Sequence, residues 1–119
     1  MQVSKKKVNQ ILEKQVKGMM WQLISDIKNP EEAEKIMGGI LTDTELSAIT
    51  KRLAVGYWLK KNRSYEVIKE NLKVSSATIA TVQQDLKKPG WKAAILKIEA
   101  EEWATKWEAK INNLFKIKK

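Results

Sequence analysis

The chain has 119 residues, enough for one domain with a modest core. It contains no Cys and no His, which excludes disulfides, zinc fingers and the usual catalytic triads, so no metal, cofactor or enzymatic activity is expected. Lys and Arg outnumber Asp and Glu by 23 to 14, and the resulting net charge of +9 favours a nucleic acid as partner. Because no uncharged apolar run is long enough to span a membrane, we expect a soluble, cytoplasmic protein with no membrane partner.

The composition predicts an all-α fold, since prolines occur only at positions 30 and 89 and Ala, Leu, Ile, Lys and Glu dominate. Residues 4–28 form the first expected helix. Its apolar positions share one face by their i, i+3, i+4 spacing. These positions are Val8, Ile11, Leu12, Val16, Met19, Met20, Leu23 and Ile27.

Two further helices are expected before the middle of the chain. Asn29 caps the second helix, and Gly38-Gly39 ends it. Thr42 and Glu45 have the spacing of a capping box, so a third helix begins there and continues to about Lys61. The residues expected on the inner side of this helix are Ile49, Leu53, Tyr57 and Leu59.

A helix-turn-helix is predicted over residues 64–86. Ser64 caps a short helix over 65–72, and residues 73–75 make a tight turn in which Val74 faces inward. Ser75 or Ser76 caps a second short helix that ends at Leu86. In a chain of this charge, such a motif indicates DNA binding.

The last predicted helix covers residues 91–115, after a break at residues 87–90. Its apolar stripe changes sides: Trp91, Ile95 and Ile98 share one face, whereas the later apolar residues share a face roughly opposite. Those later residues are Trp103, Trp107, Ile111 and Leu114. Such a helix either breaks near Ala100 or contacts two different bodies. The expected organisation is a helical core over 1–89 and a Trp-rich helical extension over 90–119, whose tryptophans fill a core or a dimer interface.

Several short matches together resemble the Trp repressor family. They are the LTxxE opening at Leu41, the KRLAV run around Arg52, and the SxATI sequence that begins at Ser75. The resemblance covers roughly residues 35–86 in register. It implies an all-helical, intertwined homodimer that binds double-stranded operator DNA through its helix-turn-helix.

The resemblance also bears on a small-molecule effector. Arg52 stands where the family has an arginine lining its tryptophan pocket, but the family's second arginine and the following glycine fall on Thr81 and Val82. Tryptophan is therefore not expected as the effector. Arg52 is predicted either to contact a ligand or to form an interface salt bridge, for example with a carboxylate of the other subunit.

The predicted contacts with DNA divide into two groups. Polar side chains of the second short helix face the bases, because Ser, Thr and Gln can bond to base edges. They are Ser75, Ser76, Thr78, Thr81 and Gln83, with Ala80 and Gln84 also available for the outer face. The residues predicted to hold phosphates are Lys69, Lys73, Lys87 and Lys88.

We therefore expect a dimeric, sequence-specific transcription regulator. One alternative from another class is a protein-interaction module, in which the Trp-rich helix docks a partner and the helix-turn-helix is only scaffold. The Ser/Thr/Ala-rich second helix contains no Arg or Lys, so a fold that has lost DNA binding also stays open. An RNA-binding version is a further alternative, although few aromatic residues outside the tryptophans and Tyr65 are available for base stacking.

Overall fold

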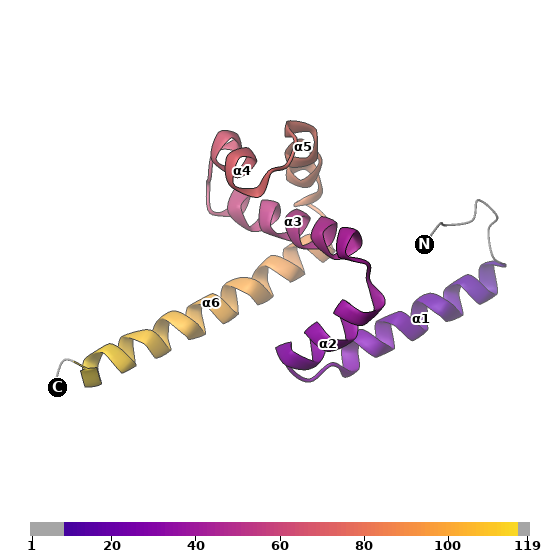
Figure 1. Cartoon of the computed structure of the whole chain (residues 1–119), viewed down its shortest axis with the longest axis horizontal. Coiled ribbons are helices and arrows are strands. Elements are labelled where there is room, and N and C mark those ends of the chain that lie inside the picture. The colour runs from indigo at the N-terminus through magenta and orange to yellow at the C-terminus, as the bar shows by residue number, and fades with distance from the viewer. Residues whose placement is uncertain (1–8, 117–119) are drawn as a thin grey trace. The chain divides into compact units, whose positions relative to one another are not determined.

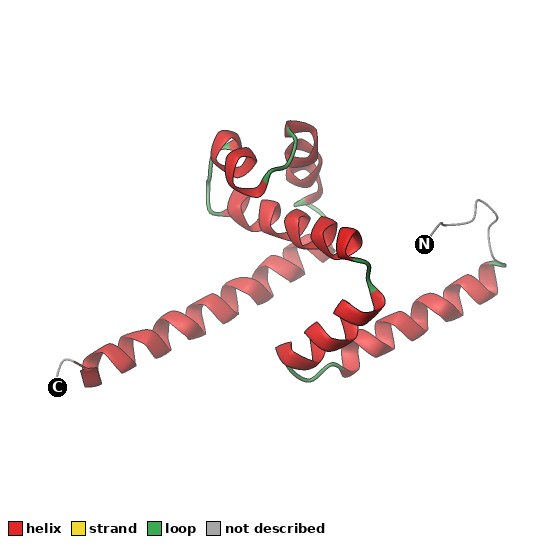
Figure 2. Ribbon diagram, in the orientation of Figure 1, coloured by secondary structure: helices red, strands yellow, loops and turns green. Residues whose placement is uncertain are grey.

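The computed structural model describes residues 9–116, and the side chains of residues 9–106. Within that part every regular element is a helix, which confirms the predicted all-α class (Figures 1 and 2). The described helices are α1 (Gln10–Asp26), α2 (Pro30–Ile40), α3 (Asp43–Lys60), α4 (Tyr65–Leu72), α5 (Ser76–Asp85) and α6 (Pro89–Lys116). The chain forms two compact units, Met1–Leu46 and Ser47–Lys119.

Helix α1 begins later than predicted. The Oδ1 atom of Asn9 accepts hydrogen bonds from the backbone N–H groups of Ile11 and Leu12, at 2.8 and 3.4 Å, so Asn9 caps a helix that starts at Gln10. The predicted start at residue 4 lies outside the described residues, as do residues 5–8. The helix also ends at Asp26, two residues before the predicted end.

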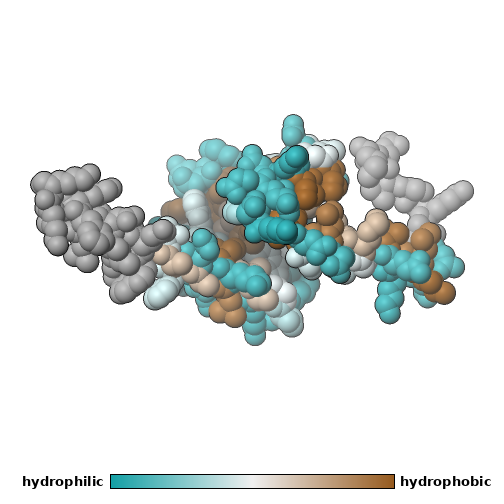
Figure 3. Space-filling view, turned by 90° about the horizontal axis from the view of Figure 1, so that it is seen from below, coloured by the Kyte–Doolittle hydropathy of each residue, from teal (hydrophilic) through white to brown (hydrophobic). Residues whose placement is uncertain are grey.

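The apolar face of α1 is largely open within its unit. None of the residues of α1, all of which the structure describes, is buried. Ile11 and Met19 are 71% and 69% exposed, and Met20 and Leu23 are only half-buried. Figure 3 shows such apolar residues lying at the surface among hydrophilic ones. An amphipathic helix with an open apolar face requires something to cover it.

Two predicted helix caps are confirmed. The Glu32 N–H donates to Oδ1 of Asn29 at 2.8 Å at the start of α2. At the start of α3 the Glu45 N–H donates to Oγ1 of Thr42 at 3.1 Å, and the Thr42 N–H donates to Oε1 of Glu45 at 2.8 Å. This reciprocal pair satisfies two N–H groups that a helix start otherwise leaves without partners.

The predicted end of α2 at Gly38-Gly39 is wrong. The helix continues through both glycines to Ile40, and the Leu41 N–H donates to the carbonyl of Met37 at 2.9 Å. Ile36 and Met37, just before the glycines, are half-buried. The roughly 1 kcal/mol that a glycine costs inside a helix is not enough to end α2 here.

The core of the second unit forms where α3, α4 and α5 meet. Val55, Ile68, Ile79 and Val82 are buried there. Partly buried residues pack around them: Trp58, Leu59, Tyr65, Leu72, Val74 and Trp91. The predicted inner side of α3 is therefore only partly right. Leu59 packs on the core and Tyr57 is half-buried, but Ile49 and Leu53 are 46% and 39% exposed.

The predicted helix-turn-helix is confirmed. Oγ of Ser64 accepts from the Val67 N–H at 3.2 Å and caps α4. Lys73 adopts a left-handed conformation (φ 55°, ψ 50°) that ends α4, and Val74 packs on the core as predicted. Ser75, not Ser76, then caps α5, which ends at Asp85.

Helix α6 lies against α3 through a close contact. An atom placed as Cβ on Gly56 would come within 2.4 Å of Cζ3 of Trp91, so the indole packs directly on the backbone of α3. Ile95 is buried further along, and Ile98 is half-buried, which confirms the first predicted face of this helix. Of the two alternatives for this helix, the break near Ala100 is absent, because α6 continues without interruption (Figure 1). The predicted second face beyond Trp103 lies outside the residues whose side chains the structure describes.

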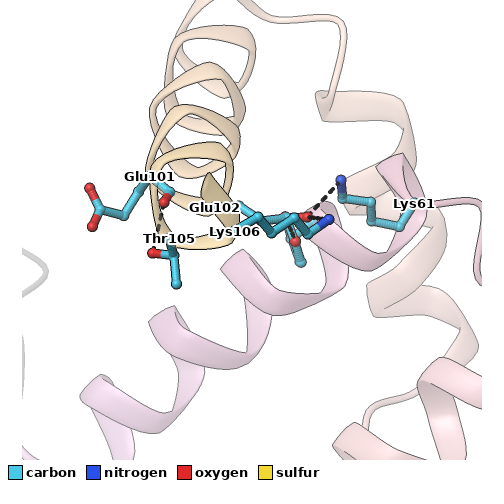
Figure 4. A network of polar contacts seen from close by, with 6 residues as sticks. Lys61, Glu101, Glu102, Thr105 and Lys106 are labelled. Carbon is cyan, nitrogen blue, oxygen red and sulfur yellow. Dashed lines mark hydrogen bonds and ion pairs between the residues drawn. The ribbon is translucent and has the colours of Figure 1, made fainter. Parts of the chain in front are cut away.

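A polar network joins the end of α3 to α6 (Figure 4). The hydroxyl of Tyr57 donates to Oε2 of Glu102, and Nζ of Lys61 lies 3.4 Å from Oε1. Nζ of Lys106 lies 2.7 Å from the same oxygen. One carboxylate on α6 therefore meets Tyr57 of α3 and Lys61, which directly follows α3 in the loop that leads into the helix-turn-helix.

Candidate nucleic-acid interface

The outer face of α5 is defined by its buried side. Ile79 and Val82 point into the core, so the positions farthest around the helix face solvent. These are Ala77, Ala80, Thr81 and Gln84, all exposed and related by i, i+3, i+4 and i+7 spacing. The face is small and rich in methyl groups, with one long polar side chain.

The five residues predicted to face bases are all exposed, but most of their polar groups already have partners. Oγ of Ser75 accepts from the Thr78 N–H at 3.1 Å and lies 3.0 Å from Oγ1 of Thr78. The hydroxyl of Thr81 donates to the carbonyl of Ala77 at 3.0 Å. These local bonds orient the three hydroxyl groups and leave their acceptor sides, and the methyl groups of the two threonines, for a partner.

Gln83 differs from its neighbour Gln84. The hydroxyl of Tyr65, at the start of α4, donates to Oε1 of Gln83. Tyr65 itself packs on the core, so it holds the Gln83 amide toward α4. Within the described part of the chain, the Gln84 amide makes no hydrogen bond. The structure thus separates two glutamines that were both predicted to be available on the outer face.

The lysines that are predicted to hold phosphates lie before and after α5 along the chain. Lys69 and Lys73 are exposed on α4 and at its end, and Lys87 and Lys88 are exposed in the turn after α5. Lys88 forms an ion pair with Asp85, with Nζ 3.2 Å from Oδ1. In the part of the chain that the structure describes, the other three lysines form no ion pair.

Arg52 lies beside α5 in the same unit. A cleft of about 490 Å³ has this residue in its wall. The other residues that line it are Ala77, Thr78, Thr81, Val82, Asp85 and Trp91. Trp91 was not predicted from the sequence as a neighbour of this site. One signal was present: Gly56 follows Arg52 by four residues and lies on the same side of α3, where its missing side chain leaves room for an indole.

The family model of the Trp repressor protein matches residues 14–99. The chain belongs to the Trp repressor family. Among curated proteins no match is found. The matched range covers most of α1, the whole helix-turn-helix and the packed first half of α6.

Membership of the Trp repressor family gives the general function. The family consists of helix-turn-helix DNA-binding regulators and not of enzymes, and the α4–turn–α5 arrangement is the corresponding motif here. In the described residues, none of the helices combines the length and the apolar character that crossing a bilayer requires.

Proposed function

We propose that the protein is a sequence-specific, double-stranded-DNA-binding transcription regulator that inserts α5 into the major groove. The observation that carries the proposal is the exposed face of α5, opposite Ile79 and Val82 and free of large apolar or acidic side chains. A ten-residue helix is about 15 Å long, comparable with the width of about 12 Å of the major groove.

The positive charge of the chain supports the insertion of α5 into the major groove. Lys69, Lys73, Lys87 and Lys88 lie before and after α5 along the chain and are exposed, so they can contact phosphates on either side of the groove. The net charge of +9 attracts DNA before any specific contact forms. Serine and threonine hydroxyls of α5 supply further contacts, with Ser76, Thr78 and Thr81 nearest the bases.

The test is selection of bound duplexes from a random pool, followed by mobility shifts at low and moderate salt. We expect an enriched sequence with two half-sites about one helical turn apart, and affinity that falls steeply with salt. Recovery of unselected sequence at every salt concentration would contradict sequence-specific binding.

A homodimer is the second part of the proposal. A groove of about 410 Å³ between α3 and α6 is lined mainly by uncharged residues: Ile49, Arg52, Leu53, Lys88, Gly90, Trp91 and Ala94. With only a few residues fully buried in the described chain, a second copy is the occupant that would cover both this groove and the open face of α1. Arg52, at the edge of the groove, would then pair with a carboxylate of that copy.

Sedimentation equilibrium tests the dimer. The expected mass is twice 13.7 kDa, and Leu53→Glu should shift it toward one copy by placing a charge in the groove. Leu96→Glu is the control, because Leu96 is 67% exposed on α6 and does not line this groove. A monomeric parent protein at tens of micromolar would contradict the proposal.

Free tryptophan is not the proposed effector. The α5 side of the cleft beside Arg52 offers Thr81 and Val82 in place of a second cation, and the Asp85 carboxylate also lines it. A ligand carboxylate therefore meets one positive and one negative group. We expect added tryptophan to leave duplex affinity unchanged, and a rise of tenfold or more would contradict this.

A protein-interaction module remains the alternative function, and the exposure of Leu96 on α6 favours it. Removal of residues after Pro89 would not test it cleanly, since Trp91 and Ile95 belong to the core. Leu96→Ala is better suited. The module predicts loss of a partner with this variant and no duplex binding by the parent protein.

A further inference from the structure

We infer that Gln84 is the residue of α5 that determines base specificity, and that it selects adenine within an A·T-rich half-site. The inference rests on the proposed major-groove binding by α5. It assigns specificity to a residue outside the group of five that the sequence pattern selects, and it follows from which polar groups of α5 are already bonded.

The two glutamines of α5 differ in the hydrogen bonds that their amides can still make. A glutamine recognises adenine by a bidentate contact, in which its Oε1 accepts from N6 and its Nε2 donates to N7. Oε1 of Gln83 already accepts the Tyr65 hydroxyl, which turns that amide toward α4. Gln84 has both amide atoms unbonded within the described chain, so it alone of the two glutamines presents the complete pair.

The two glutamines also lie on different sides of α5. Gln84 lies on the solvent-facing side of α5 with Ala77, Ala80 and Thr81, whereas Gln83 lies nearer to α4. Side chains of a helix lean toward its N-terminus, so the Gln84 amide extends over the turn that holds Ala80 and Thr81. In a recognition helix the N-terminal residues contact the bases, so this lean brings the Gln84 amide closer to the groove.

The neighbours of Gln84 on the exposed face of α5 are rich in methyl groups. Ala77 and Ala80 offer only methyl groups, and Thr81 has the proton of its hydroxyl bonded to the Ala77 carbonyl, which leaves its methyl group and the acceptor side of the hydroxyl. Methyl groups of alanine and threonine contact the C5-methyl of thymine. One bidentate amide beside a methyl surface therefore matches adenine and thymine better than guanine and cytosine, which require charged or donor-rich partners.

The experiment compares Gln84→Ala, Gln84→Glu and Gln83→Ala with the parent protein on duplexes selected by the parent. Gln83→Ala is the matched control, because it removes the same side chain at the next exposed position. Each variant is checked for unchanged thermal unfolding. Affinity is then measured for the selected duplex and for duplexes substituted at each base pair.

We expect Gln84→Ala to lose about 5- to 150-fold of discrimination at one adenine position, the range for a bidentate contact, with little change elsewhere. Gln84→Glu should shift preference there toward cytosine, whose N4 group donates to a carboxylate. Gln83→Ala should keep the parent preference.

Two results would overturn the inference. If the parent has a sequence preference that Gln84→Ala preserves, Gln84 is not the determinant, although DNA binding by α5 stands. If the parent binds no duplex, or binds all duplexes equally, the proposed function fails together with the inference.

Discussion

Gly56 sets the distance between α3 and α6. A Cβ atom at this position would lie 2.4 Å from Cζ3 and 2.9 Å from Cη2 of Trp91, well inside normal contact. The indole cannot retreat easily, because Trp91 also packs on the buried core. A residue with no side chain is therefore what lets α6 pack here, and the contact fixes one wall of the cleft beside α5.

An added methyl group in a well-packed site costs about 1–3 kcal/mol, and alanine gains roughly 1 kcal/mol over glycine in a helix. Gly56→Ala should therefore destabilise the protein by a net amount of up to about 2 kcal/mol. Urea unfolding followed by tryptophan fluorescence measures the change. Gly18→Ala is the control, since no atom lies within 4 Å of the added Cβ in α1 and stability should rise slightly. Equal gains in both variants would mean that Trp91 does not pack on Gly56.

Single residues also show why the base-facing group could not be predicted from the sequence. Helical spacing places Gln83, four residues after the buried Ile79, beside the core, and places Gln84 on the opposite side of α5. What spacing does not give is the partner of Gln83, the hydroxyl of Tyr65, which lies eighteen residues earlier in the chain. Such a tertiary contact leaves no periodic signal in one chain.

At the scale of helices, the caps were predictable, whereas the buried side of α3 was predicted only in part. Ser64, Thr42 and Asn29 cap the predicted helices because a cap needs only a side-chain oxygen and an N–H two or three residues away. Helix α3, in contrast, is apolar on several sides. Whether Leu53 or Val55 is buried depends on where α4, α5 and α6 lie, which spacing within α3 does not encode.

Ser75 gives a direct test of a cap within the recognition motif. Ser75→Ala removes the oxygen that accepts from the Thr78 N–H, and we expect a loss of about 1 kcal/mol in stability together with weaker binding to DNA. Ser76→Ala serves as the comparison, because Ser76 is exposed and is the first residue inside α5. Thermal unfolding of both variants distinguishes the two serines, and a larger loss for Ser76→Ala would be inconsistent with the observed cap.

The capping box of α3 makes part of the stability depend on pH. Hydrogen bonds from the backbone N–H of Thr42, and then from its side chain, hold the pKa of Glu45 below its ordinary value of 4.5. A carboxyl group whose pKa is lower in the folded state stabilises the fold above its unfolded pKa. This stabilisation is lost as the pH falls through the lowered value.

Glu45→Gln should therefore be less stable than the parent at neutral pH, and the difference should shrink below about pH 4.5 as the parent carboxylate is protonated. Urea midpoints measured between neutral and acidic pH test this expectation. A difference that stays constant across the whole range would show that the charge of Glu45 does not contribute to the cap.

At the scale of the whole molecule, an excess of positive charge accompanies a small core. Within the described chain, only Val55, Ile68, Ile79, Val82 and Ile95 are buried apolar side chains. Apolar surface on α1 and α3 stays open, which the amphipathic pattern alone did not indicate, because that pattern shows a face and not its occupant. The positive net charge, by contrast, was predicted from the composition, because net charge does not depend on the fold.

Salt dependence connects this charge to the proposed orientation on DNA. Each phosphate that a lysine neutralises contributes about 0.9 to the slope of log affinity against log salt concentration. Lys73 is exposed at the turn before α5 and forms no ion pair among the described residues, so Lys73→Ala should lower the slope by about one and weaken all duplexes alike. Lys106→Ala is the control, since its ammonium is bound to Glu102 far along α6. Equal slopes for the parent and Lys73→Ala would exclude this lysine from the interface and require α5 to approach the duplex in another orientation.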